Sequence, residues 1–203
     1  MKSEKLIIVV LCLFLAIFNA AAVTVRPSSV VIPIRTGFDD GDESCTLDLG
    51  KNEAYLGKND LTCSGIPFVT GLRFLDVPIK RNAEIISAYI EFTADGPYSN
   101  TIGLNIYGDA AANSLPLTNG LNRQTTVSKV SWAIGQKWTW NTIKKTPDIS
   151  NIIRELTSKP DWEYNNDLTV LIKQSSGTTH RRIFAYERDR SKVAKLVINY
   201  RNP

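Results

Sequence analysis

Four carboxylates stand close together near the start of the chain, and they are the side chains best suited to hold a metal ion. They flank a glycine and are Asp39, Asp40, Asp42 and Glu43. Ca²⁺ takes roughly six to eight oxygen ligands, and an acidic loop can supply several of them together with backbone carbonyls. Because the EF-hand spacing is absent, a solvated acidic turn that protects a sheet edge from aggregation is the alternative. We therefore expect either a structural Ca²⁺ at this turn or no cofactor.

Large aromatic side chains can provide a stacking surface for a sugar ring. The C–H face of a sugar packs on an exposed indole, so aromatic residues on a flat sheet would suit a polysaccharide. We expect Trp140 or Trp162 to be such a platform, with Tyr186 on a nearby strand. The alternative is that these rings fill the core, because Trp is highly buried on average.

Arginines gather toward the C-terminal end, where they can bind an anionic group. Arg181 and Arg182 are adjacent, and Arg188 follows shortly after them. A guanidinium binds carboxylate or sulfate through two parallel hydrogen bonds, so an acidic polysaccharide such as a uronate is a candidate ligand. The alternative is surface ion pairing with Glu187 and Asp189, which contributes little stability.

The sequence contains few of the residue combinations that are typical of catalytic sites. His180 is the single histidine, and no Gly-x-Ser-x-Gly turn accompanies it, so a Ser-His-Asp triad has little support. Neither a phosphate-binding glycine loop nor a His-Glu-x-x-His motif occurs. The paired carboxylates of a glycoside hydrolase are not excluded by the sequence, since Asp and Glu are spread along the chain. We expect a protein that is not an enzyme and has no catalytic residue.

The N-terminal residues predict export. A basic start precedes an apolar run and a small-residue site at Ala20, Ala21 and Ala22, which is typical of a secretory signal peptide. The apolar run is shorter than the roughly 20 residues of a membrane-spanning helix, which disfavours an uncleaved anchor. We expect residues 1–22 to be removed, residues 23–203 to form one secreted domain, and no other segment to span a membrane.

The cysteine count and the charge agree with an exported domain. Cys12 lies in the signal peptide, and Cys45 and Cys63 remain. An even pair in an exported chain usually forms a disulfide, two free thiols being the alternative. A formal net charge of +4 over 203 residues is mild and dispersed, and it gives no reason to expect nucleic acid or a membrane surface as a partner.

Alternating apolar and polar residues predict short antiparallel strands. The clearest strand is expected at residues 85–93, where Ile86, Ala88, Ile90 and Phe92 share one face. The opposite face is polar, as in a strand that is buried on one side only. Arg73 lies in the apolar strand before it, and we expect it to be buried and paired with a loop carboxylate. Further strands are expected at residues 29–35, 54–56, 69–74, 101–107, 127–132, 137–140, 168–174, 182–186 and 194–200, with mainly loop at 38–60.

One helix is expected at about residues 147–158. Thr146 suits the N-cap, Pro147 the first helical position, and Asp148 the positive start of the helix. An apolar stripe follows at helical spacing and consists of Ile149, Ile152, Ile153 and Leu156. Short strands separated by turn signals, with this one helix, predict an all-β antiparallel jelly-roll β-sandwich.

Several short segments resemble the DNRLRE-type domain, an extracellular jelly-roll module with relatives among carbohydrate-binding modules. They recur in order between residues 31 and 200 and include residues 39–43, Gly71-Leu72-Arg73-Phe74, residues 83–92, 104–108, Val130-Ser131-Trp132, 146–149, Trp162 and 196–200. The resemblance implies a β-sandwich that binds polysaccharide in some members, and packing roles for Trp132 and Trp138. The chain departs from the family pattern at Cys45, Cys63 and residues 186–189.

These features predict a secreted, non-catalytic module that binds extracellular carbohydrate or matrix through Tyr, Trp and Arg side chains. A second hypothesis is a structural subunit that self-associates into an extracellular filament or coat. The subunits would be joined through residues 23–36, an apolar N-terminal strand that completes the sheet of a neighbour by β-augmentation. Pairing of this strand within its own sheet is the alternative.

Overall fold

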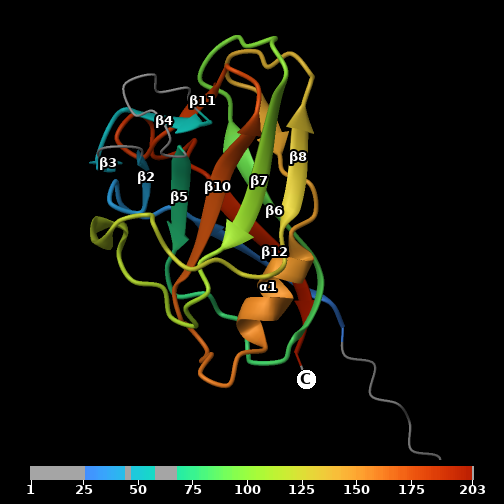
Figure 1. Cartoon of the computed structure of the whole chain (residues 1–203). Coiled ribbons are helices and arrows are strands. Elements are labelled where there is room, and N and C mark those ends of the chain that lie inside the picture. Colours follow the sequence, from blue (N-terminus) through green and yellow to red (C-terminus); the bar gives the residue numbers. More distant parts are fainter. Residues whose placement is uncertain (1–25, 44–46, 58–67, 203) are drawn as a thin grey trace, which may run out of the picture.

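Two antiparallel β-sheets packed face to face form the body of the structure, a computed structural model that describes residues 26–43, 47–57 and 68–202 (Figure 1). One sheet has four strands in the order β1-β12-β6-β9, and the other has six in the order β3-β2-β5-β10-β7-β8. Strand β11 pairs with β4 in a third sheet of two strands. The predicted all-β antiparallel sandwich with one short α-helix is confirmed.

The strands are β1 (Ser28–Pro33), β2 (Asp40–Glu43), β3 (Leu47–Leu49), β4 (Glu53–Leu56), β5 (Val69–Phe74), β6 (Glu84–Thr93), β7 (Ile102–Gly108), β8 (Val130–Ile134), β9 (Ile143–Lys145), β10 (Leu168–Ser176), β11 (Arg181–Phe184) and β12 (Lys195–Arg201). The helices are α1 (Ser150–Thr157) and the 3₁₀ helix η1 (Leu117–Asn119).

Strand β6 alternates between core and surface as expected, except at its start. Ala88, Ile90 and Phe92 are buried between the sheets. Ile85 takes the inward position at the start of the strand, whereas Ile86 is 39% exposed. The prediction for Ile86 is wrong because the pairing of β6 with β12 shifts register there, and such a bulge turns the side chains that precede it to the opposite face.

Two stretches differ from the predicted elements. Residues 38–60 were expected to be mainly loop apart from a strand at 54–56, which is β4, but their described part also contains β2 and β3. The strand expected at residues 137–140 is absent. Trp138 instead makes an isolated bridge to Tyr98, and the paired strand of this region is β9. The intrinsic strand propensity of the Trp-rich residues 137–140 favours a strand there. The strand forms instead at the later residues of β9, because these are the ones that pair with β6.

Helix α1 covers one end of the sandwich with the predicted apolar stripe (Figure 1). Ile149, Ile152, Ile153 and Leu156 are all buried. The helix starts later than expected because residues 146–149 bond to β6. Thr146 therefore does not cap the helix, and its hydroxyl accepts a hydrogen bond from the Ile90 amide at 3.0 Å.

A covering segment, residues 109–126, packs over β5 and β10 on the outer face of the six-stranded sheet. Its Leu117 and Leu121 are buried against Val69 and Leu171 of β5 and β10 in a second apolar cluster. The two ends of the segment bond to each other, since the Ala110 amide donates to the Gln124 carbonyl at 2.9 Å. The part of the outer face formed by β5 and β10 is therefore occupied by the protein itself.

The described part of the N-terminal strand pairs within its own chain. Strand β1 runs antiparallel to β12, with Ser28 opposite Tyr200 and Pro33 opposite Lys195. This pairing is the alternative to donating residues 23–36 to a neighbour. Cys45, Cys63 and residues 1–22 lie outside the described residues, so the disulfide and the signal peptide stay predictions. Within the described ranges, no helix has both the length and the apolar character needed to span a membrane.

Candidate functional site

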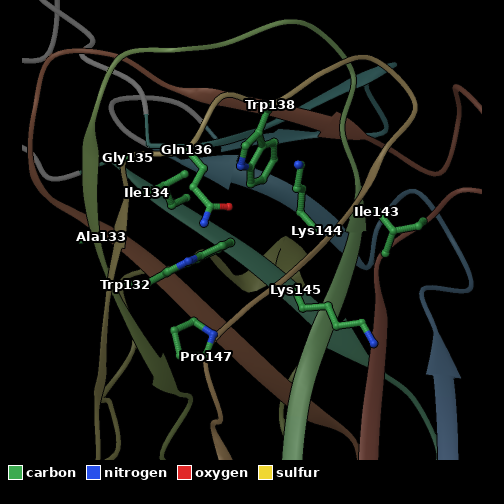
Figure 2. Close-up of a pocket in the computed structure, with 10 residues that line it drawn as sticks. All are labelled: Trp132, Ala133, Ile134, Gly135, Gln136, Trp138, Ile143, Lys144, Lys145 and Pro147. Atoms are coloured by element: carbon green, nitrogen blue, oxygen red, sulfur yellow. The ribbon is translucent and has the colours of Figure 1, made fainter.

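A groove opens where the edge strands of the two large sheets face each other. Strand β8 ends the six-stranded sheet and β9 ends the four-stranded sheet. Among the described strands none joins the two edges. The space between them has a volume of about 460 Å³ (Figure 2). We call it the edge groove. Its lining residues are Trp132, Ala133, Ile134, Gly135, Gln136, Trp138, Ile143, Lys144, Lys145 and Pro147.

Two indoles form the apolar part of the edge groove. Trp132 is half-buried, and its ring stacks on Phe92 of β6 with centroids 6.2 Å apart and planes 12° apart. Trp138 is almost fully buried, with its centroid 6.2 Å from that of Trp132. Because Phe92 belongs to the core, the Trp132 indole is fixed in place and presents a prearranged surface to the groove.

Lysines from β9 supply the charge of the edge groove. Lys145 pairs with Glu91 at 3.0 Å and donates to the Tyr89 hydroxyl at 3.3 Å. These hydrogen bonds raise the pKa of Lys145 above its ordinary value. Lys144 is directed into the groove, toward Trp138 (Figure 2).

A buried arginine lies behind the groove. Arg181 is 0% exposed, and its guanidinium carbon lies 5.8 Å from the centroid of Trp138. It donates to the carbonyls of His180 at 3.0 Å, Ile134 at 3.3 Å, and Asn100. Burial lowers the pKa of Arg181. Arg181 was predicted to contact sugar directly, but in this structure it is buried behind Trp138 and Ile134.

Three residues of the predicted sugar site do come together, outside the edge groove. Trp140 is 50% exposed and meets Phe184 edge-on at 5.8 Å. The Arg188 guanidinium lies 5.3 Å from both ring centroids. Arg188 and Arg182 pair with opposite oxygens of Asp95 at 3.2 and 3.1 Å.

The charges of these arginines are compensated inside the protein. Asp95 is fully buried between Arg182 and Arg188, and Arg182 also pairs with Glu53 at 2.7 Å. Burial raises the pKa of Asp95, and the two arginines oppose that rise. The partners are therefore Asp95 and Glu53, not the predicted Glu187 and Asp189. Neither arginine has its full charge available for a ligand.

Trp162 and Tyr186 lie away from both places. Trp162 is 3% exposed and donates its indole N–H to the Ile79 carbonyl at 2.9 Å, so the prediction that it forms a surface platform is wrong. Tyr186 is half-buried, its backbone amide donates to Asp40, and Arg190 lies over its ring at 4.9 Å.

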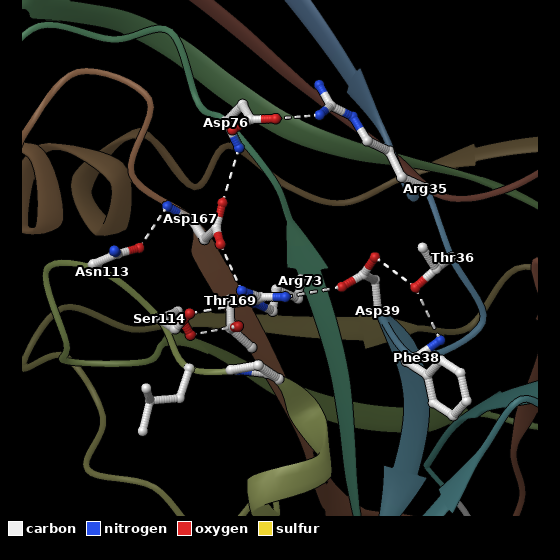
Figure 3. Close-up of polar contacts among 12 residues, drawn as sticks. Arg35, Thr36, Phe38, Asp39, Arg73, Asp76, Asn113, Ser114, Asp167 and Thr169 are labelled. Carbon is white, nitrogen blue, oxygen red and sulfur yellow. Dashed lines mark hydrogen bonds and ion pairs between the residues drawn. The ribbon is translucent and has the colours of Figure 1, made fainter.

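The four predicted calcium ligands point to separate partners. Asp39 pairs with Arg73 at 3.2 Å (Figure 3), and Asp40 accepts from the Tyr186 amide at 3.0 Å. Asp42 accepts from the Tyr55 amide, and Glu43 accepts from the Leu121 amide. Among the described residues, no group of three His, Cys, Asp or Glu side chains is arranged to hold a metal ion. Calcium at this site stays an untested prediction.

The predicted pairing of Arg73 with a loop carboxylate is confirmed. Its guanidinium lies between Asp39, at 3.2 Å, and Asp167, at 2.5 Å (Figure 3). The side chain is 13% exposed. This ion-pair network belongs to the outer face of the six-stranded sheet, where it helps to hold the covering segment, since the Arg73 Nε donates to the Ser114 carbonyl.

Sequence reasoning missed the edge groove. Gln136, Lys144 and Lys145 carried no signal, and Trp132 was assigned to packing by resemblance. The groove depends on which strands end the two sheets, and these ends are set by pairings between residues far apart in the sequence. The spacing of Trp132 and Trp138 around a glycine turn was the one local hint.

Comparison with known proteins leaves the family open. No protein-family model matches the chain, and no curated protein matches it. A carbohydrate-binding module, CBM28, specific for non-crystalline cellulose, is 10% identical over 80% of this chain and 78% of its own, with a TM-score of 0.30. The structure of infectious bursal disease virus, Gx strain, is 14% identical over 86% of this chain and 33% of its own, with a TM-score of 0.28. These similarities are distant and assign no function to the chain.

Proposed function

We propose that the chain is a non-catalytic carbohydrate-binding module and that an extracellular glycan lies in its edge groove. The observation that carries the proposal is the half-buried Trp132 indole, fixed against Phe92 and lining a hollow of about 460 Å³. Small-molecule sites usually measure about 300–1,000 Å³ and combine apolar walls with a few polar groups. Gln136 and Lys144 provide such groups beside the indoles.

The composition of the groove supports binding without hydrolysis. Glycoside hydrolysis uses two carboxyl groups on either side of the scissile bond. The ten described residues that line the groove include no Asp, Glu, His, Ser or Cys. The groove therefore offers an aromatic wall and cationic hydrogen-bond donors, but neither a carboxylate pair nor a hydroxyl or thiol nucleophile.

The test is electrophoresis of the folded chain through gels that contain soluble polysaccharides, with two tryptophan variants. We expect at least one polysaccharide to retard the wild-type chain, and Trp132→Ala to lose about 30-fold or more in affinity, as for a central anchor residue. Trp140→Ala is the matched control, because Trp140 is half-exposed but does not line the groove. Circular dichroism verifies that both variants fold.

Two results would contradict the proposal. If Trp140→Ala loses retardation and Trp132→Ala keeps it, binding occurs at the surface formed by Trp140 and Arg188. If no polysaccharide in a panel of neutral, uronic and sulfated polymers retards the wild-type chain, the function is not carbohydrate binding.

A further inference from the structure

Lys144 lies on the inner face of the sandwich, where lysine is rare. It pairs with Phe92 in the register of β9 and β6, whereas Lys145 pairs with Glu91. Paired residues of an antiparallel ladder share one face of the sheet, so Lys144 shares the core side with Phe92, which is 1% exposed. An ammonium group on the apolar side of a sheet is costly unless a polar partner or water meets it.

No carboxylate of the protein compensates Lys144 in the described residues. Its neighbour Lys145 has Glu91 at 3.0 Å, but the ion pairs found in the described chain do not include Lys144. Figure 2 shows the side chain extending into the edge groove, beside the Trp138 indole. Its charge is therefore directed at whatever occupies the groove.

The buried Arg181 adds a second positive charge behind the same wall. Within the described residues its hydrogen bonds go to backbone carbonyls, and none of the ion pairs there includes it. A charge in the interior is screened far less than one in water, and a concave surface lined by one sign of charge concentrates its field. Ile134 and Trp138 touch Arg181 on one side and line the groove on the other.

The arginine-rich surface around Trp140 lacks this excess of charge. Arg182 and Arg188 share the buried carboxylate of Asp95, and Arg182 also meets Glu53. In contrast, among the described residues the ion pairs made by Lys144, Lys145 and Arg181 involve one carboxylate, that of Glu91. The edge groove is thus the more positive of the two aromatic places.

We infer that the guest of the edge groove is an anionic saccharide, whose carboxylate or sulfate group is bound by Lys144 while a sugar ring packs on Trp132. This inference rests on the proposed function and names the class of its ligand. Arg181 strengthens the attraction from behind without touching the guest. Lys144 thereby determines the preference for a charged over a neutral glycan.

Calorimetric titration with paired oligosaccharides tests the preference. The two members of each pair share the same sugar backbone, but one is neutral and the other carries either carboxylate or sulfate groups. Comparison of the carboxylated with the sulfated members shows which anionic group is bound. We expect the wild-type chain to prefer a charged member, and Lys144→Ala to lose roughly ten- to hundredfold in affinity for it, as for a lost charge-assisted hydrogen bond. Lys144→Arg should retain most of the affinity.

The matched control is Lys137→Ala. Lys137 is exposed on the turn that carries Trp138 but does not line the groove, and its removal changes the net charge equally. We expect this variant to bind like the wild-type chain. Equal affinity for neutral and charged members, with loss in Trp132→Ala, would overturn the inference and leave the proposed function standing.

A titration with inorganic sulfate decides the question even if no saccharide binds. The indole N–H signals of Trp132 and Trp138 are followed by NMR in the wild-type chain, Lys144→Ala and Lys137→Ala. If sulfate shifts the Trp138 signal in the wild-type chain and in Lys137→Ala, but not in Lys144→Ala, Lys144 forms an anion site. Identical titrations in all three proteins would overturn it.

Discussion

At the scale of single residues, Arg73 explains how a charge is accommodated in an apolar strand. It lies between Asp39 and Asp167, and Asp39 is almost fully buried. The pattern of one arginine in an apolar run was enough to predict a carboxylate partner. The identity of the partners was not predictable, since Asp39 and Asp167 are brought to Arg73 by different strands.

Replacement of Arg73 by Met should lower the free energy of unfolding by about 3 kcal/mol, because it leaves the buried Asp39 without its counter-charge. Urea unfolding measures the change. The matched control is Arg35→Met, whose pair with Asp76 is 45% and 60% exposed and should contribute less than about 1 kcal/mol. Equal effects of the two substitutions would show that the burial of the Arg73 network is unimportant.

Asp40 makes stability depend on pH. Burial raises its pKa to about 7, and Glu187 and Asp39 add to the rise. A carboxyl group with a raised folded-state pKa binds its proton more tightly when folded, so its contribution is complete below about pH 4 and is lost as the pH rises to about 7. Across that window the free energy of unfolding should fall by at most about 1.4 kcal/mol per pH unit.

Asp40→Asn should remove this slope. Asn stays neutral, and its side-chain oxygen can still accept from the Tyr186 amide. The variant should therefore be more stable than the wild-type chain near neutral pH, with the difference vanishing toward about pH 4. Urea unfolding across this range measures it, with the exposed Asp76→Asn as control. Parallel pH profiles of the wild-type and Asp40→Asn chains would contradict the prediction.

The same assay tests calcium at residues 39–43. A bound Ca²⁺ would favour ionised Asp40, lower its pKa and abolish the pH slope of the wild-type chain. We expect chelator and Ca²⁺ to give the same slope, because the four carboxylates point to different partners. A slope that disappears with Ca²⁺ would restore the calcium hypothesis.

At the scale of elements, the covering segment, residues 109–126, decides which surface is free. It was predicted as a long connection because it is rich in Ala, Asn, Gly and Pro, and in the structure it holds Leu117 and Leu121 on the outer face of the sheet. Gly71 of β5 makes room for it, since a Cβ there would lie 2.5 Å from the Leu121 Cδ2. A sheet-face platform for sugar is thereby excluded over β5 and β10.

Leu121→Ala should lower the free energy of unfolding by about 2–4 kcal/mol, because Leu121 is fully buried in this second cluster. Chemical denaturation measures the loss. Leu115→Ala lies in the same segment but is 60% exposed, and should change stability by less than about 1 kcal/mol. If both variants are as stable as the wild-type chain, the segment does not pack as described.

Local patterns predicted elements better than their ends. Residues close in sequence determine the alternation of buried and exposed side chains in β6, β7 and β12, and the apolar stripe of α1. These predictions are confirmed. The side of Ile86, the start of α1 and the position of β9 depend on partners far away in the chain. A bulge or a competing strand bond shifts an element by a few residues without any local signal.

At the scale of the whole molecule, the candidate site belongs to no single element. Trp132 comes from β8, Lys144 from β9 and Trp138 from the turn between them, and Arg181 approaches from β11. The sandwich predicted from the sequence is confirmed, but the space between its two edge strands follows only from the full strand order. This is why the burial of Trp162 and Arg181 was not predicted while the architecture was.

The most direct test of glycan binding in the edge groove is NMR of the four indole N–H signals during titration with a polysaccharide that retards the wild-type chain. If the glycan lies in the edge groove, the signals of Trp132 and Trp138 shift, that of Trp140 changes little, and that of the buried Trp162 does not respond. Shifts confined to Trp140, or an equal response of all four indoles, would contradict binding in the edge groove.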